Sequence, residues 1–101
     1  MFALTLGLLM QTGAVRADDT AAARALFTEK AAPPCAVCHT LKDAGAEGMV
    51  GPVLDELKPN AQRVLTALRN GIGAMPSYRD LLTPAQIELL ARYVARVTGA
   101  N

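Results

Sequence analysis

The sequence has very little histidine and cysteine, the residues that most often hold zinc in structural sites. Among 101 residues it has one histidine and two cysteines, and it also has no tryptophan. A four-ligand zinc site needs a second Cys/His pair, and none is present. No strand pattern surrounds the cysteines, which argues against a thioredoxin-like dithiol. The chain also has no repeat, charge run or low-complexity tract, and its length predicts a single domain.

An excess of charge of either sign is also missing. Ten Lys+Arg against nine Asp+Glu give a formal net charge of +1. If residues 1–17 are removed, Arg16 is removed with them, and nine basic residues balance nine acidic ones. Phosphate binding requires a basic surface, so we expect no nucleic acid among the partners.

The longest apolar run, residues 2–10, is too short to span a bilayer. A small-x-small cleavage site follows at 15–17, and two aspartates come next. This layout predicts a secretory signal peptide over 1–17 and a mature domain over 18–101. No basic residue precedes the run, so the start could lie further upstream, and a short buried helix is the alternative. We expect a periplasmic protein that does not span the membrane once the peptide is cleaved.

Both cysteines and the only histidine stand together in Cys35-Ala36-Val37-Cys38-His39. This spacing is typical of c-type haem attachment, in which each thiol adds across one vinyl group of the haem. The histidine that follows is then carried beneath the iron, where a ring nitrogen binds it. A Cys35–Cys38 disulfide is the alternative in an oxidising compartment. A covalent haem would also stabilise a chain too short for a thick core.

One histidine leaves the opposite axial position of the iron open or filled by another residue type. The candidates are Met10, Met49 and Met75, and Met10 belongs to the predicted signal peptide. Met49 follows His39 closely, whereas Met75 lies in a distant loop between capped helices and can reach the other face. We therefore predict His39 and Met75 as iron ligands, which favours electron transfer. With an open position, the alternative is a haem-based ligand sensor or a peroxidase-like protein.

The periodicity of apolar residues indicates helices. Asn60 and Thr83 are predicted N-caps, and Gln86 would complete a capping box with Thr83. Asp19 is predicted to cap the first helix, which prolines 33 and 34 end. In chain order the predicted helices are 20–31, a turn at the cysteines, a turn ending near 57, 61–70, and a last helix from 84 that Gly99 closes.

Taken together, these residues resemble the class I cytochromes c, small monohaem electron carriers. The resemblance covers essentially residues 18–101 and implies an all-α fold of about four short helices around one covalently attached haem c and its iron. It also implies that the first and last helices cross, here at Ala23 and Tyr93. The features that carry it are Leu26-Phe27, Cys35-x-x-Cys38-His39, Gly51-Pro52-x-Leu54, Gly73-Ala74-Met75-Pro76 and Tyr93.

The resemblance implies roles for individual site residues. The Pro52 carbonyl would accept a hydrogen bond from the ring nitrogen of His39 that is not on iron. Leu54 would pack on the haem face. One departure is that Phe27 lies further before the first cysteine than in relatives, with 31–34 as an apparent insertion. The expected cofactor-binding residues are Cys35, Cys38, His39, Pro52, Leu54 and Met75.

The implied function is one-electron transfer without a catalytic acid, base or nucleophile. The runs 50–54 and 70–76 are most similar to periplasmic cytochromes that accept electrons from sulfite-oxidising molybdenum enzymes. The expected partners are therefore a donor such as sulfite dehydrogenase and a downstream cytochrome or oxidase, with the protein itself a monomer. Docking should use a small apolar patch at the haem edge, formed by Ala32, Pro33, Pro34, Ala36, Val37, Met49, Ala74 and Pro76.

Overall fold

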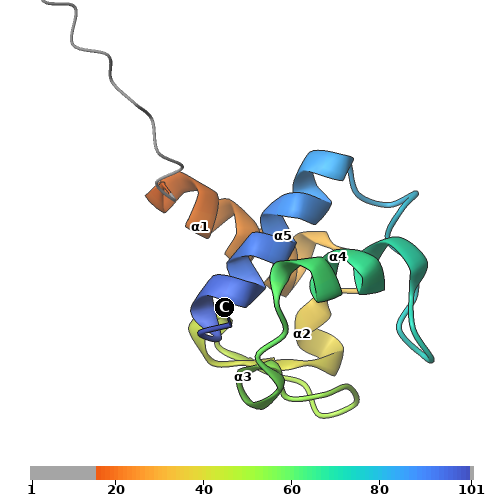
Figure 1. The fold of residues 1–101 in the computed structure, drawn as a ribbon, viewed down its shortest axis with the longest axis horizontal. Helices are drawn as coiled ribbons and strands as arrows, with labels where there is room; N and C mark the ends of the chain where they lie inside the picture. The colour runs from red at the N-terminus through yellow and green to blue at the C-terminus, as the bar shows by residue number, and fades with distance from the viewer. Residues whose placement is uncertain (1–15, 101) are drawn as a thin grey trace, which may run out of the picture.

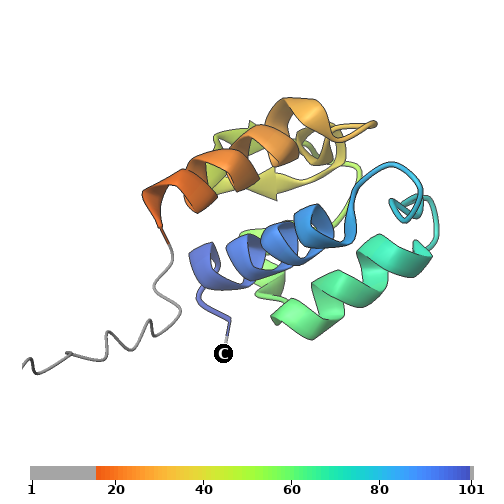
Figure 2. The same ribbon diagram turned by 90° about the horizontal axis from the view of Figure 1, so that it is seen from above.

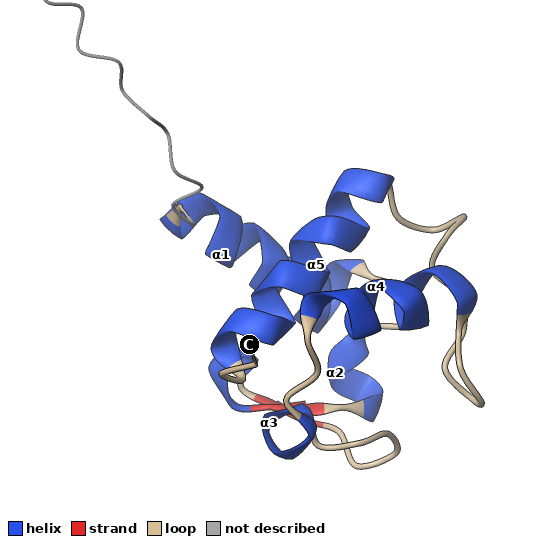
Figure 3. Ribbon diagram, viewed as in Figure 1, coloured by secondary structure: helices blue, strands red, loops and turns tan. Residues whose placement is uncertain are grey.

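The computed structural model describes residues 16–100, so most of the predicted signal peptide lies outside the described residues. The described chain is mostly helical, with one short pair of strands (Figures 1 and 3), which confirms the predicted fold class. Within this range, no helix has the length and apolar character needed to cross a membrane. In order, the elements are α1 (Ala17–Ala25), the π-helical η1 (Leu26–Lys30), α2 (Cys35–Cys38), β1 (Thr40–Leu41), η2 (Lys42–Ala44), β2 (Ala46–Glu47), α3 (Leu54–Leu57), α4 (Ala61–Asn70) and α5 (Pro84–Val97).

The first and last helices cross, as predicted. Figure 1 shows α1 meeting α5, and Figure 2 shows α4 on the other side of α5. Ala23 on α1 and Tyr93 on α5 are both fully buried in the core. Because alanine has so small a side chain, it lets the two backbones approach while the tyrosine ring fills the space beside it.

A polar network fastens this crossing to the turn η2. The Arg24 guanidinium lies 2.9 Å from Asp43 Oδ2, and the Tyr93 hydroxyl donates to the same oxygen at 2.6 Å. The pKa of Asp43 lies below its usual value, mainly because Tyr93 donates a hydrogen bond to the carboxylate and also because Arg24 is nearby. The pKa of Tyr93 is raised, mainly by burial of its hydroxyl and also by the neighbouring Asp43. Solvent screens the exposed Arg24 ion pair, so the hydrogen bond from the buried Tyr93 is the stronger of the two contacts.

The ends of the first helix differ from the prediction. It begins at Ala17, with Arg16 at the N-cap position and no side-chain cap, so the prediction that Asp19 caps it was wrong. Both aspartates lie in the first turn, where their charge complements the positive end of the helix dipole. At the other end the helix widens into the π turn η1, in which the Ala31 N–H bonds to the Leu26 carbonyl. This wide turn takes up part of the longer spacing between Phe27 and the cysteines.

The two predicted caps are confirmed, one at the start of α4 and one at the start of α5. Asn60 Oδ1 accepts from the N–H of Arg63 at 2.8 Å. Thr83 and Gln86 form both hydrogen bonds of a capping box, at 2.9 and 3.1 Å.

Gly71 ends α4 with φ +71°, and an added Cβ would lie 2.8 Å from the Met75 carbonyl oxygen. The loop therefore leaves α4 along a path that only glycine permits.

The segment that follows the cysteines contains short regular elements. Strands β1 and β2 pair antiparallel, with Thr40 opposite Glu47. The Thr40 hydroxyl also donates to the Gly48 carbonyl at 2.8 Å. These contacts fold the chain back from His39 toward Gly51, and so place the following residues beside the histidine ring.

Candidate haem site

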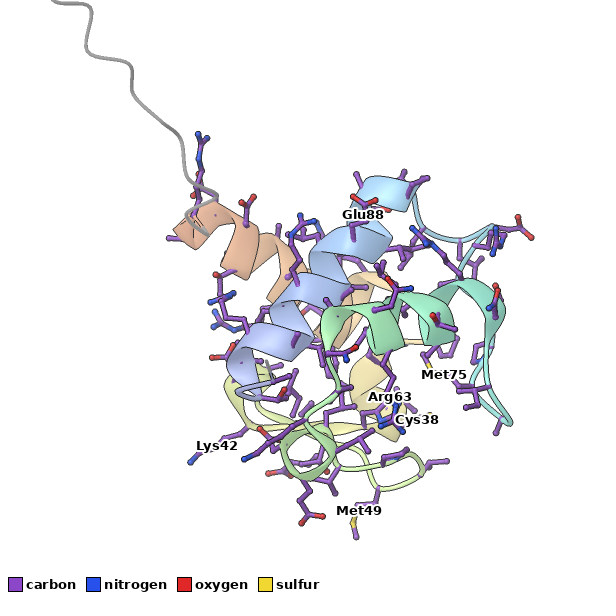
Figure 4. All side chains as sticks on the ribbon, viewed as in Figure 1. Cys38, Lys42, Met49, Arg63, Met75 and Glu88 are labelled. Carbon is purple, nitrogen blue, oxygen red and sulfur yellow. The ribbon has the colours of Figure 1, made fainter. Side chains whose placement is uncertain are left out.

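One cavity of about 810 Å³ lies among α2, α3, α4, α5 and the loop after α4. Its volume falls within the roughly 300–1,000 Å³ that ligand sites span. Figure 4 shows Cys38 and Met75, two of its lining residues, on separate elements. All six predicted cofactor-binding residues line this cavity: Cys35, Cys38, His39, Pro52, Leu54 and Met75. Apolar side chains complete much of the wall: Phe27, Val64, Leu68, Leu90 and Val94.

The His39 ring is held by a backbone carbonyl. Its Nδ1 lies 2.7 Å from the Pro52 carbonyl oxygen. A carbonyl can only accept a hydrogen bond, so this contact places the imidazole proton on Nδ1. Nε2 then keeps its lone pair, which is the form of imidazole that binds a metal. The same interaction fixes the ring orientation and makes the nitrogen a stronger ligand.

Two glycines allow the chain to pass close to this histidine. A Cβ added at Gly51 would lie 2.6 Å from Cε1 and 2.9 Å from Nδ1 of His39. A Cβ added at Gly48 would lie 2.6 Å from the carbonyl oxygen of Ala36 and 2.6 Å from the backbone nitrogen of His39. Gly48 was not among the site residues expected from the sequence. Both positions require glycine because a side chain would push the chain off the haem-attachment turn.

The cysteines carry free thiols on the cavity wall. Burial raises the pKa of the Cys35 thiol to about 11, so this thiol is protonated at neutral pH. Across residues 16–100, no three His, Cys, Asp or Glu side chains gather to hold a metal ion. The described site therefore provides two thiols and an imidazole beside an apolar cavity, which is the donor set of a c-type haem.

Tyr78 is a site residue that sequence reasoning missed. Its side chain is buried and lines the cavity, and its hydroxyl donates to the Pro33 carbonyl at 2.7 Å. Its backbone N–H donates to the Leu68 carbonyl, also at 2.7 Å. The pKa of Tyr78 is raised to about 12, mainly by burial and also by the two nearby cysteines. The residue ties the Met75 loop to the segment before Cys35, and its signal in the sequence was that it is the single aromatic residue between α4 and α5.

The two mature-chain methionine candidates lie in different environments. Met75 is half-buried, packs against the core and lines the cavity. Its backbone pairs with Ile72 through N–H···O bonds of 3.0 and 2.9 Å, which close the tip of the loop. Met49 is 90% exposed and does not line the cavity. Figure 4 shows it at the edge of the molecule. Met75 is thus the candidate whose thioether the fold brings to the site.

Comparison with known proteins agrees with this geometry. The family model described as "Cytochrome C oxidase, cbb3-type, subunit III" matches residues 18–94. Cytochrome c6 of Rippkaea orientalis (strain PCC 8801 / RF-1) is 35% identical over 101 residues, covering 92% of this chain and 84% of that protein. The crystal structure of the c-type cytochrome SorU from Sinorhizobium meliloti has a TM-score of 0.77 and 53% identity, covering 84% of this chain and 97% of that one. The chain belongs to the class I, monohaem cytochromes c.

The protein is therefore an electron carrier rather than an enzyme, and it binds one covalent haem c. The residues present fit that group, since two free thiols and an imidazole with a free Nε2 all line one apolar cavity. Cys35, Cys38, His39 and Met75 are the residues that would hold the haem. When bound, the haem supplies one-electron redox chemistry, and the chain's own residues position and tune it.

Proposed function

We propose that this protein is a periplasmic one-electron carrier whose iron stays bound to His39 and Met75 in both redox states. The observation that supports this proposal best is that the Pro52 carbonyl accepts a hydrogen bond from His39 Nδ1 and leaves Nε2 free, while Met75 lines the same cavity. Two fixed axial ligands keep the reorganisation small when an electron enters or leaves. A thioether ligand also favours reduced iron and raises the reduction potential. Export through cleavage of residues 1–17 is part of this proposal.

Carbon monoxide tests the ligand set. The reduced wild-type protein should not bind added carbon monoxide, because Met75 occupies the sixth position. The measurement is the absorption spectrum of the reduced protein before and after the gas is added. Rapid and complete carbon monoxide binding would contradict the proposed ligand set and favour a ligand sensor or a peroxidase-like protein.

The docking surface is proposed to be the apolar rim of the cavity mouth. Val50 and Ile72 line the cavity and are still 76% and 69% exposed. Val37 and Met49, from the predicted patch, are exposed by 59% and 90%. Val50 and Ile72 are additions to that patch. A small apolar surface on a chain of balanced charge gives a weak, transient contact that depends little on electrostatic steering.

The proposed donor is a sulfite-oxidising molybdenum enzyme, and a downstream cytochrome or oxidase would accept the electron. The resemblance of runs 50–54 and 70–76 to cytochromes with such donors supports this partner. Both runs lie at the cavity, where Val50, Pro52 and Ile72 are among the lining residues. The donor would therefore meet the residues that surround the haem edge.

Turnover with such an enzyme should be nearly independent of salt. With sulfite and a purified sulfite dehydrogenase, the protein should be reduced at a rate that changes less than about twofold between 50 and 200 mM salt, because surface charge contributes little to an apolar contact. The measurement is the initial rate of haem reduction at each salt concentration. A steep fall would overturn the apolar docking surface, and no reduction at any salt concentration would overturn the proposed donor.

A further inference from the structure

One charged side chain on the cavity wall has no role in the function proposed above. Arg63, in the first turn of α4, is the only Lys, Arg, Asp or Glu among the residues that line the cavity. Figure 4 shows it near the start of α4, and its side chain is exposed at the cavity mouth. Its backbone N–H donates to Asn60 Oδ1, but its guanidinium has no hydrogen bond or ion pair within residues 16–100. A cation at the cavity is thus available to an anion.

The position of Arg63 in its helix increases the local positive potential. The first turn of a helix carries the positive end of the backbone dipole, and acidic residues are favoured there. The first turn of α4 has no acidic residue, and it has an arginine instead. No acidic side chain in this turn balances the positive end of the dipole or the charge of the guanidinium. The start of α4 therefore favours a negatively charged group from outside the helix.

The haem itself brings such groups. Its two vinyl groups lie on one edge of the macrocycle, and its two propionates lie on the opposite edge. With the vinyl groups joined to Cys35 and Cys38, the propionates must reach a part of the wall away from α2. The start of α4 lines the cavity with polar side chains: Asn60, Gln62, Arg63 and Thr66. A carboxylate in a largely apolar cavity is costly unless it is paired, and an arginine fork pairs it with two hydrogen bonds.

We propose that Arg63 binds a haem propionate and thereby raises the reduction potential of the protein. A negative charge near the iron stabilises the ferric form, which carries one more positive charge than the ferrous form. A guanidinium that neutralises the propionate removes this preference. The inference rests on the proposed function, since it takes the haem to be joined to Cys35 and Cys38. It adds a residue that holds the far edge of the cofactor.

The test compares arginines on the same helix. Arg63→Gln removes the cation from the cavity wall, whereas Arg69→Gln removes the same charge from a residue that does not line the cavity. The measurements are the midpoint potential and the resonance Raman propionate-bending mode, which responds to hydrogen bonding. Arg63→Gln should lower the potential clearly more than Arg69→Gln and should shift the propionate mode, which Arg69→Gln should leave unchanged.

Arg63→Lys provides a second test if the glutamine variant matures poorly. Lysine keeps the charge but loses the planar fork, so the potential should stay near that of the wild type while the propionate mode shifts. Equal potential changes in Arg63→Gln and Arg69→Gln, or an unchanged propionate mode in both Arg63 variants, would overturn the proposal. Failure of the His39/Met75 ligation would appear separately, as carbon monoxide binding by the wild-type protein.

Discussion

Replacing Met75 by leucine is expected to open the sixth position of the iron. Leucine has a similar volume, so the packing at the half-buried loop position is largely kept while the sulfur ligand is lost. The reduced variant should bind carbon monoxide rapidly. Its midpoint potential should fall by on the order of 0.1 V or more, within the roughly 0.8 V range that axial ligands set. Absorption spectra with carbon monoxide and a redox titration measure the two effects.

Met49→Leu is the matched control, because it removes a thioether that is 90% exposed and lies outside the cavity wall. Its spectra and potential should equal those of the wild type. If Met75→Leu also behaved like the wild type, Met75 would be a packing residue and the proposed ligand set would be wrong. If Met49→Leu alone opened the iron, the ligand would be Met49.

Gly51→Ala is expected to disturb the haem site strongly. The new Cβ would lie 2.6 Å from the His39 ring, and the backbone of Gly51 does not have positive φ, so the effect is a steric one alone. The ring would have to turn, which weakens its hydrogen bond to Pro52. Overpacking costs about 1–3 kcal/mol, and 1 kcal/mol lowers Tm by about 4–8 °C in a domain of this size. Thermal unfolding and the yield of haem-loaded protein measure the loss.

Gly45→Asn is the control for Gly51→Ala. Gly45 has φ +62°, an added Cβ there meets nothing within 4 Å, and the residue does not line the cavity. Asparagine tolerates this left-handed conformation, so Tm and haem content should change little. Equal losses in the two variants would show that the close approach of Gly51 to His39 is unimportant.

Features encoded by neighbouring residues could be predicted from the sequence. The caps at Asn60 and Thr83 depend on contacts within three residues, and both form as predicted. The crossing of the terminal helices has no such local signature; the family resemblance implied it, and the two residues named for it, Ala23 and Tyr93, are both buried. The six cofactor-binding residues expected from the attachment spacing and the family resemblance all line one cavity.

Contacts between distant segments could not be predicted in this way. The Tyr78 hydroxyl bonds to a carbonyl 45 residues away, and the Tyr93 hydroxyl bonds to Asp43, 50 residues away. Neither pairing has a local signature, because each depends on how the elements pack. The start of α1 was wrong for a related reason: an aspartate is favoured both at the N-cap and in the first turn, so its presence does not say which position it occupies.

The account rests on a haem attached through Cys35 and Cys38, and the intact mass of the secreted protein tests this most directly. The protein would be expressed in a host that attaches c-type haem and recovered from the periplasm. The account predicts a mass equal to residues 18–101 plus one haem, retained under denaturing conditions, as two thioether bonds require. The mass of the bare polypeptide, with or without the loss of two hydrogens to a disulfide, would contradict it.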